Sequence, residues 1–113
     1  MSISQITTHV LDAVHGRPAA GVPVELLARQ GDEWRLIGTG TTDADGRATR
    51  LAASSVPSGE YRLRFDTGAY FAARDTETFY PEVLLTFLVA EEGRHYHVPL
   101  LLSPFAYSTY RGS

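Results

Sequence analysis

Short runs of β-forming residues, each ended by turn-forming residues, limit most strongly how this chain can fold. In the run 59–65, Tyr61, Leu63 and Phe65 alternate with polar residues. Because successive side chains of a strand point to opposite faces, this alternation predicts a strand with one buried and one solvated face. The sequence DADG at 43–46 is a strong turn signal, since Asp and Gly suit the local hydrogen bonds and positive φ of tight turns. These features predict an all-β fold.

Seven or eight strands are predicted along the whole chain. The runs that indicate them are 6–11, 22–28, 34–42, 47–51, 59–65, 83–89, 94–102 and 105–110. Residues 67–75 favour a helix, with Thr67 as N-cap and Tyr70, Phe71 and Arg74 about a turn apart. Without an internal repeat or a long linker, this pattern predicts a two-sheet β-sandwich with one short helix. The 113 residues suit one core, so we expect a single domain over 1–113.

Composition excludes several classes of function. A net charge of −3 and a pI near 5.7 argue against nucleic acids and anionic membranes as partners, because both bind basic surfaces. The chain has no cysteine, which excludes thiol nucleophiles and disulfides, and no lysine, which excludes Schiff-base chemistry. The first residues lack the pattern of a signal peptide, and the apolar runs are too short to span a bilayer. We therefore expect a cytoplasmic protein.

His95 and His97 are two residues apart in a predicted strand, so their side chains point to the same side. Three interpretations fit this spacing. The residues can be surface or hydrogen-bonded histidines without a function, which spacing alone favours. They can bind a metal ion with a third histidine such as His9, although no cysteine or obvious carboxylate accompanies them. They can also act in acid–base catalysis, because the pKa of histidine lies near neutrality.

Arg47 and the C-terminal residues are further candidates for a functional site. Arg47 directly follows the turn 43–46, where an arginine is more often a solvated strand end than a fixed cation for an anionic substrate or an oxyanion. The end of the chain carries Tyr110, Arg111 and Ser113 with its terminal carboxylate. Chain ends are usually polar and featureless, so these residues are candidates for a wall of an active site, and an ordinary chain end is the alternative.

Four segments, taken in order along the chain, resemble the marker sequences of the 5-hydroxyisourate hydrolases, also called transthyretin-related proteins. They are ITTHVLDAVHGRPAAGVPVEL, TDADGR, FYPEV and HYHVPLLLSPFAYSTYRGS. The YRGS ending is the most specific part. It separates these hydrolases from transthyretin itself, which shares LLSP and the sandwich but lacks the histidines and this ending. One departure is Ala106, where the family more often has glycine.

The resemblance implies a fold, an activity and an assembly. The fold is the transthyretin-like sandwich of about eight strands with one short helix. The activity is hydrolysis of 5-hydroxyisourate to 2-oxo-4-hydroxy-4-carboxy-5-ureidoimidazoline in urate degradation. Water attacks a ring acyl C–N bond, and neither a cofactor nor a metal ion is implied. The assembly is a homotetramer, a dimer of dimers in which edge strands pair across subunits.

The resemblance also assigns functional residues. The catalytic residues that it implies are His9, Arg47, His97 and Ser113. The substrate-binding residues that it implies are His9, Arg47, Tyr110 and Arg111. His9 and His97 would activate water and transfer protons, in an order that the sequence leaves open. His95 is expected to have a supporting or structural part. Two rival functions stay open: a transthyretin-like carrier of a small hydrophobic ligand without turnover, and a metallohydrolase that uses His9, His95 and His97.

Overall fold

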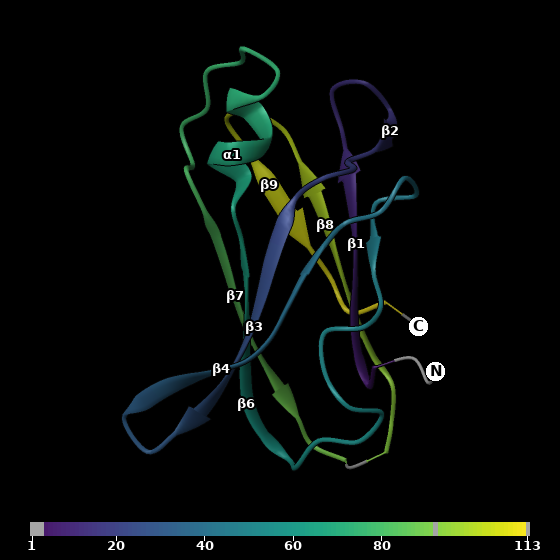
Figure 1. The fold of residues 1–113 in the computed structure, drawn as a ribbon, viewed down its shortest axis with the longest axis vertical. Coiled ribbons are helices and arrows are strands. Elements are labelled where there is room, and N and C mark those ends of the chain that lie inside the picture. Colours follow the sequence, from purple (N-terminus) through teal and green to yellow (C-terminus); the bar gives the residue numbers. More distant parts are fainter. Residues whose placement is uncertain (1–3, 92, 113) are drawn as a thin grey trace.

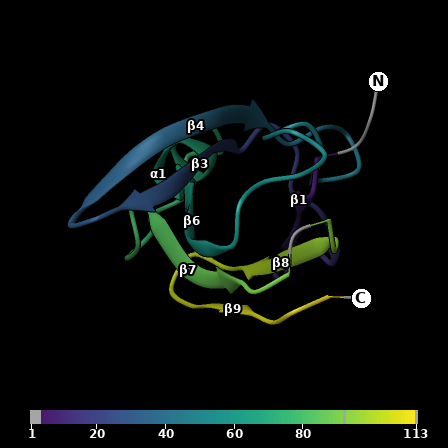
Figure 2. The ribbon, with the colours of Figure 1, turned by 90° about the horizontal axis from the view of Figure 1, so that it is seen from below.

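The computed structural model of this protein describes residues 4–91 and 93–112. Its elements are β1 (Ile6–Asp12), β2 (Arg17–Pro18), β3 (Pro23–Gln30), β4 (Glu33–Thr41), β5 (Arg47–Ala48), β6 (Gly59–Phe65), α1 (Thr67–Ala72), β7 (Val83–Val89), β8 (Tyr96–Leu102) and β9 (Tyr107–Thr109). One sheet has the strand order β2-β1-β8-β9, with β5 also paired to β1, and the other has the order β4-β3-β6-β7. The two sheets face each other, with α1 at one end of the molecule (Figures 1 and 2). The predicted two-sheet β-sandwich is therefore confirmed.

The core lies between the sheets because β1, β3, β6 and β8 bury alternate side chains. From β1 and β8 it takes Ile6, Val10, Leu100 and Leu102, and from the facing sheet Val24, Leu26, Leu63 and Phe65. Burial of each such side chain stabilises the fold by about 1.5–3 kcal/mol. The alternation confirms the strand predicted over Gly59–Phe65. It also places Thr7 and His9, the residues of β1 between the core positions, on the outer face of the five-stranded sheet.

The parallel pairing of β1 with β8 joins two segments that are far apart in the sequence. In its register Thr7 is the partner of His97, and His9 is the partner of Pro99. The short strand β5 pairs antiparallel with β1, and there His9 is the partner of Arg47. Pairing therefore collects His9, Arg47 and His97 on neighbouring strands of one sheet.

Several predicted bounds differ from the structure. The strand predicted over 47–51 is reduced to β5, and the last strand, predicted over 105–110, is reduced to β9. The strand predicted over 94–102 begins only at Tyr96, so His95 directly precedes β8. These runs have strand-forming side chains throughout, but only part of each run finds a neighbouring strand to bond.

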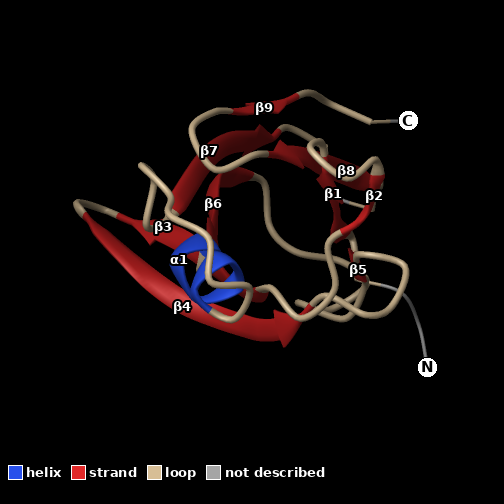
Figure 3. Ribbon diagram, turned by 90° about the horizontal axis from the view of Figure 1, so that it is seen from above, coloured by secondary structure: helices blue, strands red, loops and turns tan. Residues whose placement is uncertain are grey.

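The helix α1 ends at Ala72 rather than at residue 75, and its N-cap is Asp66 rather than Thr67. The Asp66 carboxylate accepts a hydrogen bond from the Ala69 N–H at 3.0 Å. The buried Thr67 hydroxyl instead donates to the Tyr80 carbonyl at 2.8 Å, a contact between distant segments that sequence cannot reveal. Seen from above, α1 lies close to β3 (Figure 3). Among the described residues, no helix is long and apolar enough to cross a membrane.

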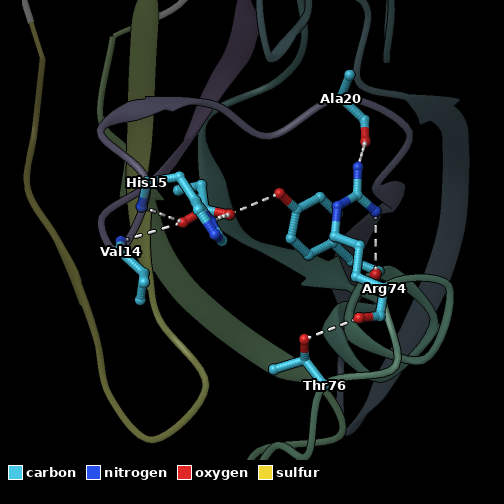
Figure 4. Close-up of polar contacts among 7 residues, drawn as sticks. Val14, His15, Ala20, Arg74 and Thr76 are labelled. Atoms are coloured by element: carbon cyan, nitrogen blue, oxygen red, sulfur yellow. Dashed lines mark hydrogen bonds and ion pairs between the residues drawn. The ribbon is translucent and has the colours of Figure 1, made fainter.

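Asp12, at the end of β1, anchors the following turn. Its buried carboxylate accepts hydrogen bonds from the backbone N–H groups of Val14 and His15, both at 3.0 Å. It also accepts from the His15 ring at 3.1 Å and from the Tyr70 hydroxyl at 2.8 Å. In Figure 4, Val14 and His15 lie on one side of this network, and Arg74, bonded to Ala20, lies on the other. The contact with Asp12 therefore gives His15 a structural role in this turn.

We expect Asp12→Asn to destabilise the protein by about 1–3 kcal/mol at neutral pH, because buried donors lose their charged acceptor. Burial raises the pKa of Asp12, but the hydrogen bonds from His15 and Tyr70 outweigh that effect and leave the pKa below its ordinary 3.8. The stabilisation is therefore fully present above the pKa of 3.8 that the unfolded chain has, and it is lost as the pH falls through the lower pKa of the folded protein. Urea unfolding of the wild type and of Asp12→Asn at pH 7 and pH 3 measures the difference in their free energies of unfolding. A difference as large at pH 3 as at pH 7, or an equal loss in the exposed control Asp32→Asn, would contradict it.

Candidate active site

His9, Arg47 and His97 come together on the outer face of the five-stranded sheet. The ring centroids of His9 and His97 lie 6.5 Å apart, with the ring planes tilted by 35°. Arg47 is the strand partner of His9. Burial lowers the pKa of His97, and the positive charge of Arg47 lowers it further. The guanidinium forms no ion pair with any of the described residues. Three predicted catalytic residues therefore share one surface, with a cation available to a ligand.

The protonation of one ring nitrogen of His9 is fixed by its partner. His9 Nε2 lies 2.8 Å from the Asp45 carbonyl oxygen. A carbonyl oxygen only accepts hydrogen bonds, so Nε2 carries the hydrogen. In the neutral ring, Nδ1 then keeps the lone pair. His9 is consequently oriented as a proton or hydrogen-bond acceptor at Nδ1.

The turn at 43–46 holds the Asp45 carbonyl in position. The Asp43 carboxylate accepts hydrogen bonds from the backbone N–H of Arg47 at 3.0 Å and of Asp45 at 2.9 Å. The bond from Arg47 is the main reason that the pKa of Asp43 is lowered. Gly46 has a φ of +78°, and a Cβ there would lie 2.4 Å from the Val10 carbonyl oxygen. The turn signal in the sequence therefore also fixes a candidate catalytic histidine, a role that sequence reasoning missed.

His97 is half-buried and favours the neutral ring. Burial lowers the pKa of His97, and the neighbouring Arg47, His95 and His9 lower it further. Its Nδ1 lies 2.8 Å from the Thr7 hydroxyl. A neutral imidazole near physiological pH is able to accept a proton. The geometry thus favours His97 as a base.

The C-terminal segment packs directly against His97. The Gly112 N–H donates to the His97 carbonyl at 2.8 Å and forms an isolated bridge beyond β9. A Cβ on Gly112 would lie 2.7 Å from the Cδ2 atom of the His97 ring. The predicted Ser113 lies outside the described residues. Gly112 is therefore the part of the YRGS ending that the structure places on the site.

Tyr110 and Arg111 occupy a neighbouring surface. With His97 they line a mainly apolar hollow of about 460 Å³ between β7 and the C-terminal segment. The Arg111 guanidinium lies over the Tyr96 ring, 4.7 Å from its centroid, and Tyr110 is 57% exposed. Neither His9 nor Arg47 lines this hollow. His97 therefore lies between His9 and Arg47 on one side and the hollow on the other. Within the described residues, the predicted site residues do not line a single pocket.

Ala106, the departure from the family's usual glycine, fits its backbone. Among the described residues only Asp75 combines a side chain with a positive φ, so Ala106 needs no conformation reserved for glycine. Its carbonyl oxygen accepts hydrogen bonds from the Ser103 N–H at 2.9 Å and the Ser103 hydroxyl at 3.0 Å. The substitution therefore leaves the turn before β9 intact.

Metal binding finds little support in the geometry of the histidines. Within the part of the chain that the structure describes, no three His, Asp or Glu side chains are grouped so that they could hold an ion. One nitrogen of His95 and one of His97 are bonded to the Thr7 hydroxyl. These contacts favour acid–base chemistry over metal ligation.

Comparison with known proteins shows the family. The HIUase/Transthyretin family matches residues 6–112, and this chain belongs to that family. The 5-hydroxyisourate hydrolase of Caulobacter vibrioides is 44% identical over 115 residues, which span 98% of this chain and all of that protein. The 5-hydroxyisourate hydrolase of Mus musculus is 44% identical over 97% of this chain and 96% of its own.

Solved structures from both branches of the family resemble this fold. The 5-hydroxyisourate hydrolase of Klebsiella pneumoniae is 38% identical, with a TM-score of 0.84 over 99% of this chain and all of that one. The transthyretin of Sparus aurata is 37% identical, with a TM-score of 0.90 over 96% of each chain. The fold therefore does not separate a hydrolase from a carrier, and the distinction depends on side chains.

We expect Gly112→Ala to displace either the His97 ring or the C-terminal segment, because the new methyl group would overlap the ring. Imidazole ¹H–¹⁵N NMR spectra should show a changed His97 environment, with the spectrum of the core unchanged. Gly31→Ala is the matched control, since nothing lies within 4 Å of its Cβ position and its φ of +61° adds only backbone strain. Unchanged His97 signals in Gly112→Ala would show that the segment does not pack as described.

Proposed function

We propose that this protein hydrolyses 5-hydroxyisourate in urate degradation without a cofactor. The observation that carries the proposal is the convergence of His9, Arg47 and His97 on one sheet face, with Nε2 of His9 bonded to a carbonyl. Relatives of similar length that are 44% identical bear the name of that hydrolase. Acyl hydrolysis needs an activated water, an oxyanion stabiliser and a proton for the leaving nitrogen. The three residues supply these functions.

His97 acts as the base that activates water. Its lowered pKa keeps the ring neutral at physiological pH, so it accepts a proton as the water oxygen attacks the ring acyl carbon. His9 orients the water through its Nδ1 lone pair. When the C–N bond breaks, the proton held by His97 passes to the leaving nitrogen, which closes the proton balance. In this proposal His97 rather than His9 takes the proton, a choice that the sequence alone leaves open.

Arg47 stabilises the negative charge that develops on the carbonyl oxygen. Its guanidinium is exposed, carries a fixed charge and forms no ion pair within the described part of the chain. A preorganised cation of this kind acts on the transition state more than on the neutral ground state. Tyr110 and Arg111 provide the wall of the adjoining hollow, and Ser113, which the family resemblance implies as catalytic, holds water or substrate.

A carrier function is the second candidate. The mainly apolar hollow beside His97 has a volume suited to a small hydrophobic ligand, and a transthyretin shares the fold. A carrier has no use for two titratable rings beside a free cation, so the hydrolase is favoured. Binding of a small apolar ligand without any turnover of 5-hydroxyisourate would instead favour the carrier over the hydrolase.

The proposed homotetramer covers surfaces that one chain leaves exposed. β7 and β9 each form an edge of their sheet, and Leu84 and Leu88 of β7 are 42% and 63% exposed. Open sheet edges with apolar neighbours favour pairing with another chain. We infer that edge strands pair across subunits in a dimer of dimers. A single domain over 1–113 and a cytoplasmic location stay predictions from the sequence.

The assembly is tested by sedimentation velocity. We expect the wild type to sediment as a tetramer and Leu88→Glu to shift it to smaller species, because a charge enters a buried interface. Leu36→Glu, at a 49% exposed residue of β4 on the opposite edge of the same sheet, is the control and should remain tetrameric, because the inferred pairing uses β7 and β9. A monomeric wild type at micromolar concentration would contradict the assembly.

The activity is tested by generating 5-hydroxyisourate in situ with urate oxidase and following the decay of its ultraviolet band. We expect the protein to accelerate the decay, and His97→Ala or His9→Ala to lose about 10²–10⁴-fold in rate. His15→Ala should keep its activity, since His15 serves the Asp12 turn. A wild type no faster than spontaneous decay would refute the function, and a fully active variant would remove that histidine from the mechanism.

A further inference from the structure

The Thr7 hydroxyl joins two histidines that the proposed reaction treats separately. On β1, Thr7 is only 2% exposed, and its Oγ1 lies 2.8 Å from His97 Nδ1 and 2.9 Å from His95 Nε2. The rings of His95 and His97 are nearly parallel, with centroids 6.2 Å apart. Thr7 lies on the outer face of its sheet, so the core does not explain its hydroxyl. A hydrogen-bonded chain therefore runs from His97 through Thr7 to His95.

One hydroxyl hydrogen cannot serve both rings at once. When the Thr7 hydroxyl donates to one ring nitrogen, its oxygen accepts from the other. If Thr7 accepts from His97 Nδ1, then Nε2 of the neutral His97 ring has the lone pair. If Thr7 donates to His97 Nδ1, then Nε2 has the hydrogen. The tautomers of His95 and His97 are thereby coupled through Thr7.

The two ends of this chain differ in their surroundings. His97 is half-buried beside Arg47 and His9, whereas His95 is exposed to solvent. A positive charge on His97 is therefore opposed by its neighbours and by burial, and the same charge on His95 is hydrated. The hydrogen bonds through Thr7 therefore connect His97 to a second histidine, His95, where a proton is exposed to water.

We propose that Thr7 and His95 form a proton relay with His97. As His97 Nε2 takes a proton from the attacking water, its Nδ1 proton moves to Thr7 Oγ1, and the Thr7 hydroxyl proton moves to His95 Nε2. The reverse transfers return the proton for the leaving nitrogen, so Thr7 keeps its hydroxyl and no proton is gained or lost. The relay rests on the proposed hydrolysis and makes Thr7 and His95 positioning residues that act through His97.

Thr7→Val and Thr7→Ser separate the hydroxyl from the shape of the side chain. Valine matches threonine in shape without the hydroxyl, and serine keeps the hydroxyl. We expect Thr7→Val to lower kcat at least about tenfold with little change in KM, and Thr7→Ser to retain most of the rate. Thermal unfolding checks that both variants are folded. Equal rates for Thr7→Val and the wild type would overturn the relay while the hydrolase function stands.

His95→Ala tests the outer end of the relay. We expect a similar loss of kcat that added imidazole restores, because a free base in the vacated space accepts the proton. Imidazole should leave the rate of Thr7→Val unchanged, because that variant lacks the buried hydroxyl between His97 and His95, which imidazole does not replace. A loss in His95→Ala that imidazole does not restore would indicate a purely structural role for His95 and contradict the relay.

NMR without substrate keeps this inference distinct from the activity. Long-range ¹H–¹⁵N spectra report the tautomer of each ring, and we expect titration of His95 to change the tautomer of His97 in the wild type and in Thr7→Ser. Thr7→Val should abolish that coupling. Absence of coupling in the wild type would refute the relay whether or not the protein hydrolyses 5-hydroxyisourate. Coupling in a wild type without turnover would refute the proposed function alone.

Discussion

The parallel pairing of β1 with β8 is the interaction on which the site depends. Its inward residues, such as Val10 and Leu100, are fully buried in the core, so a shift of register by one residue would expose them. The same register makes Thr7 the neighbour of His97 on the outer face. Burial of the core residues therefore fixes the positions of Thr7 and His97 more accurately than an exposed loop would. The geometry of the proposed site therefore depends on the packing of the hydrophobic core.

A second constraint comes from the turn before β5. Asp43 and Gly46 set its shape, and the Asp45 carbonyl that results is bonded to His9 Nε2. Arg47 then enters β5 beside His9, where its charge adds to burial in lowering the pKa of His97. One short motif thus orients a ring, supplies a cation and keeps a base neutral. The proposed relay through Thr7 would move a proton accepted at His97 away from this cation.

The sequence predicted what depends on local pattern. Alternation identified the strand that ends at Phe65, and spacing placed His95 and His97 on one side of a strand or its immediate extension. The sequence could not predict contacts between distant segments. No local pattern shows that Thr7 is the strand partner of His97. Nor does it show that Thr67 bonds the Tyr80 carbonyl, so that Asp66 is the N-cap. The signal for Thr7 was present, because it shares the face of His9, but its meaning required the partner strand.

The family contains both hydrolases and transthyretins, and this fold resembles solved examples of each. Backbone similarity therefore cannot decide the function. What decides it is whether the outer face of β1 and β8 carries groups that change protonation during a reaction. A carrier is best served by a surface whose charge stays constant, whereas this chain sets two acceptor rings beside a cation and connects one of them to solvent through a buried hydroxyl. The proposed relay would serve a protein that makes and breaks bonds, and a carrier would gain nothing from it.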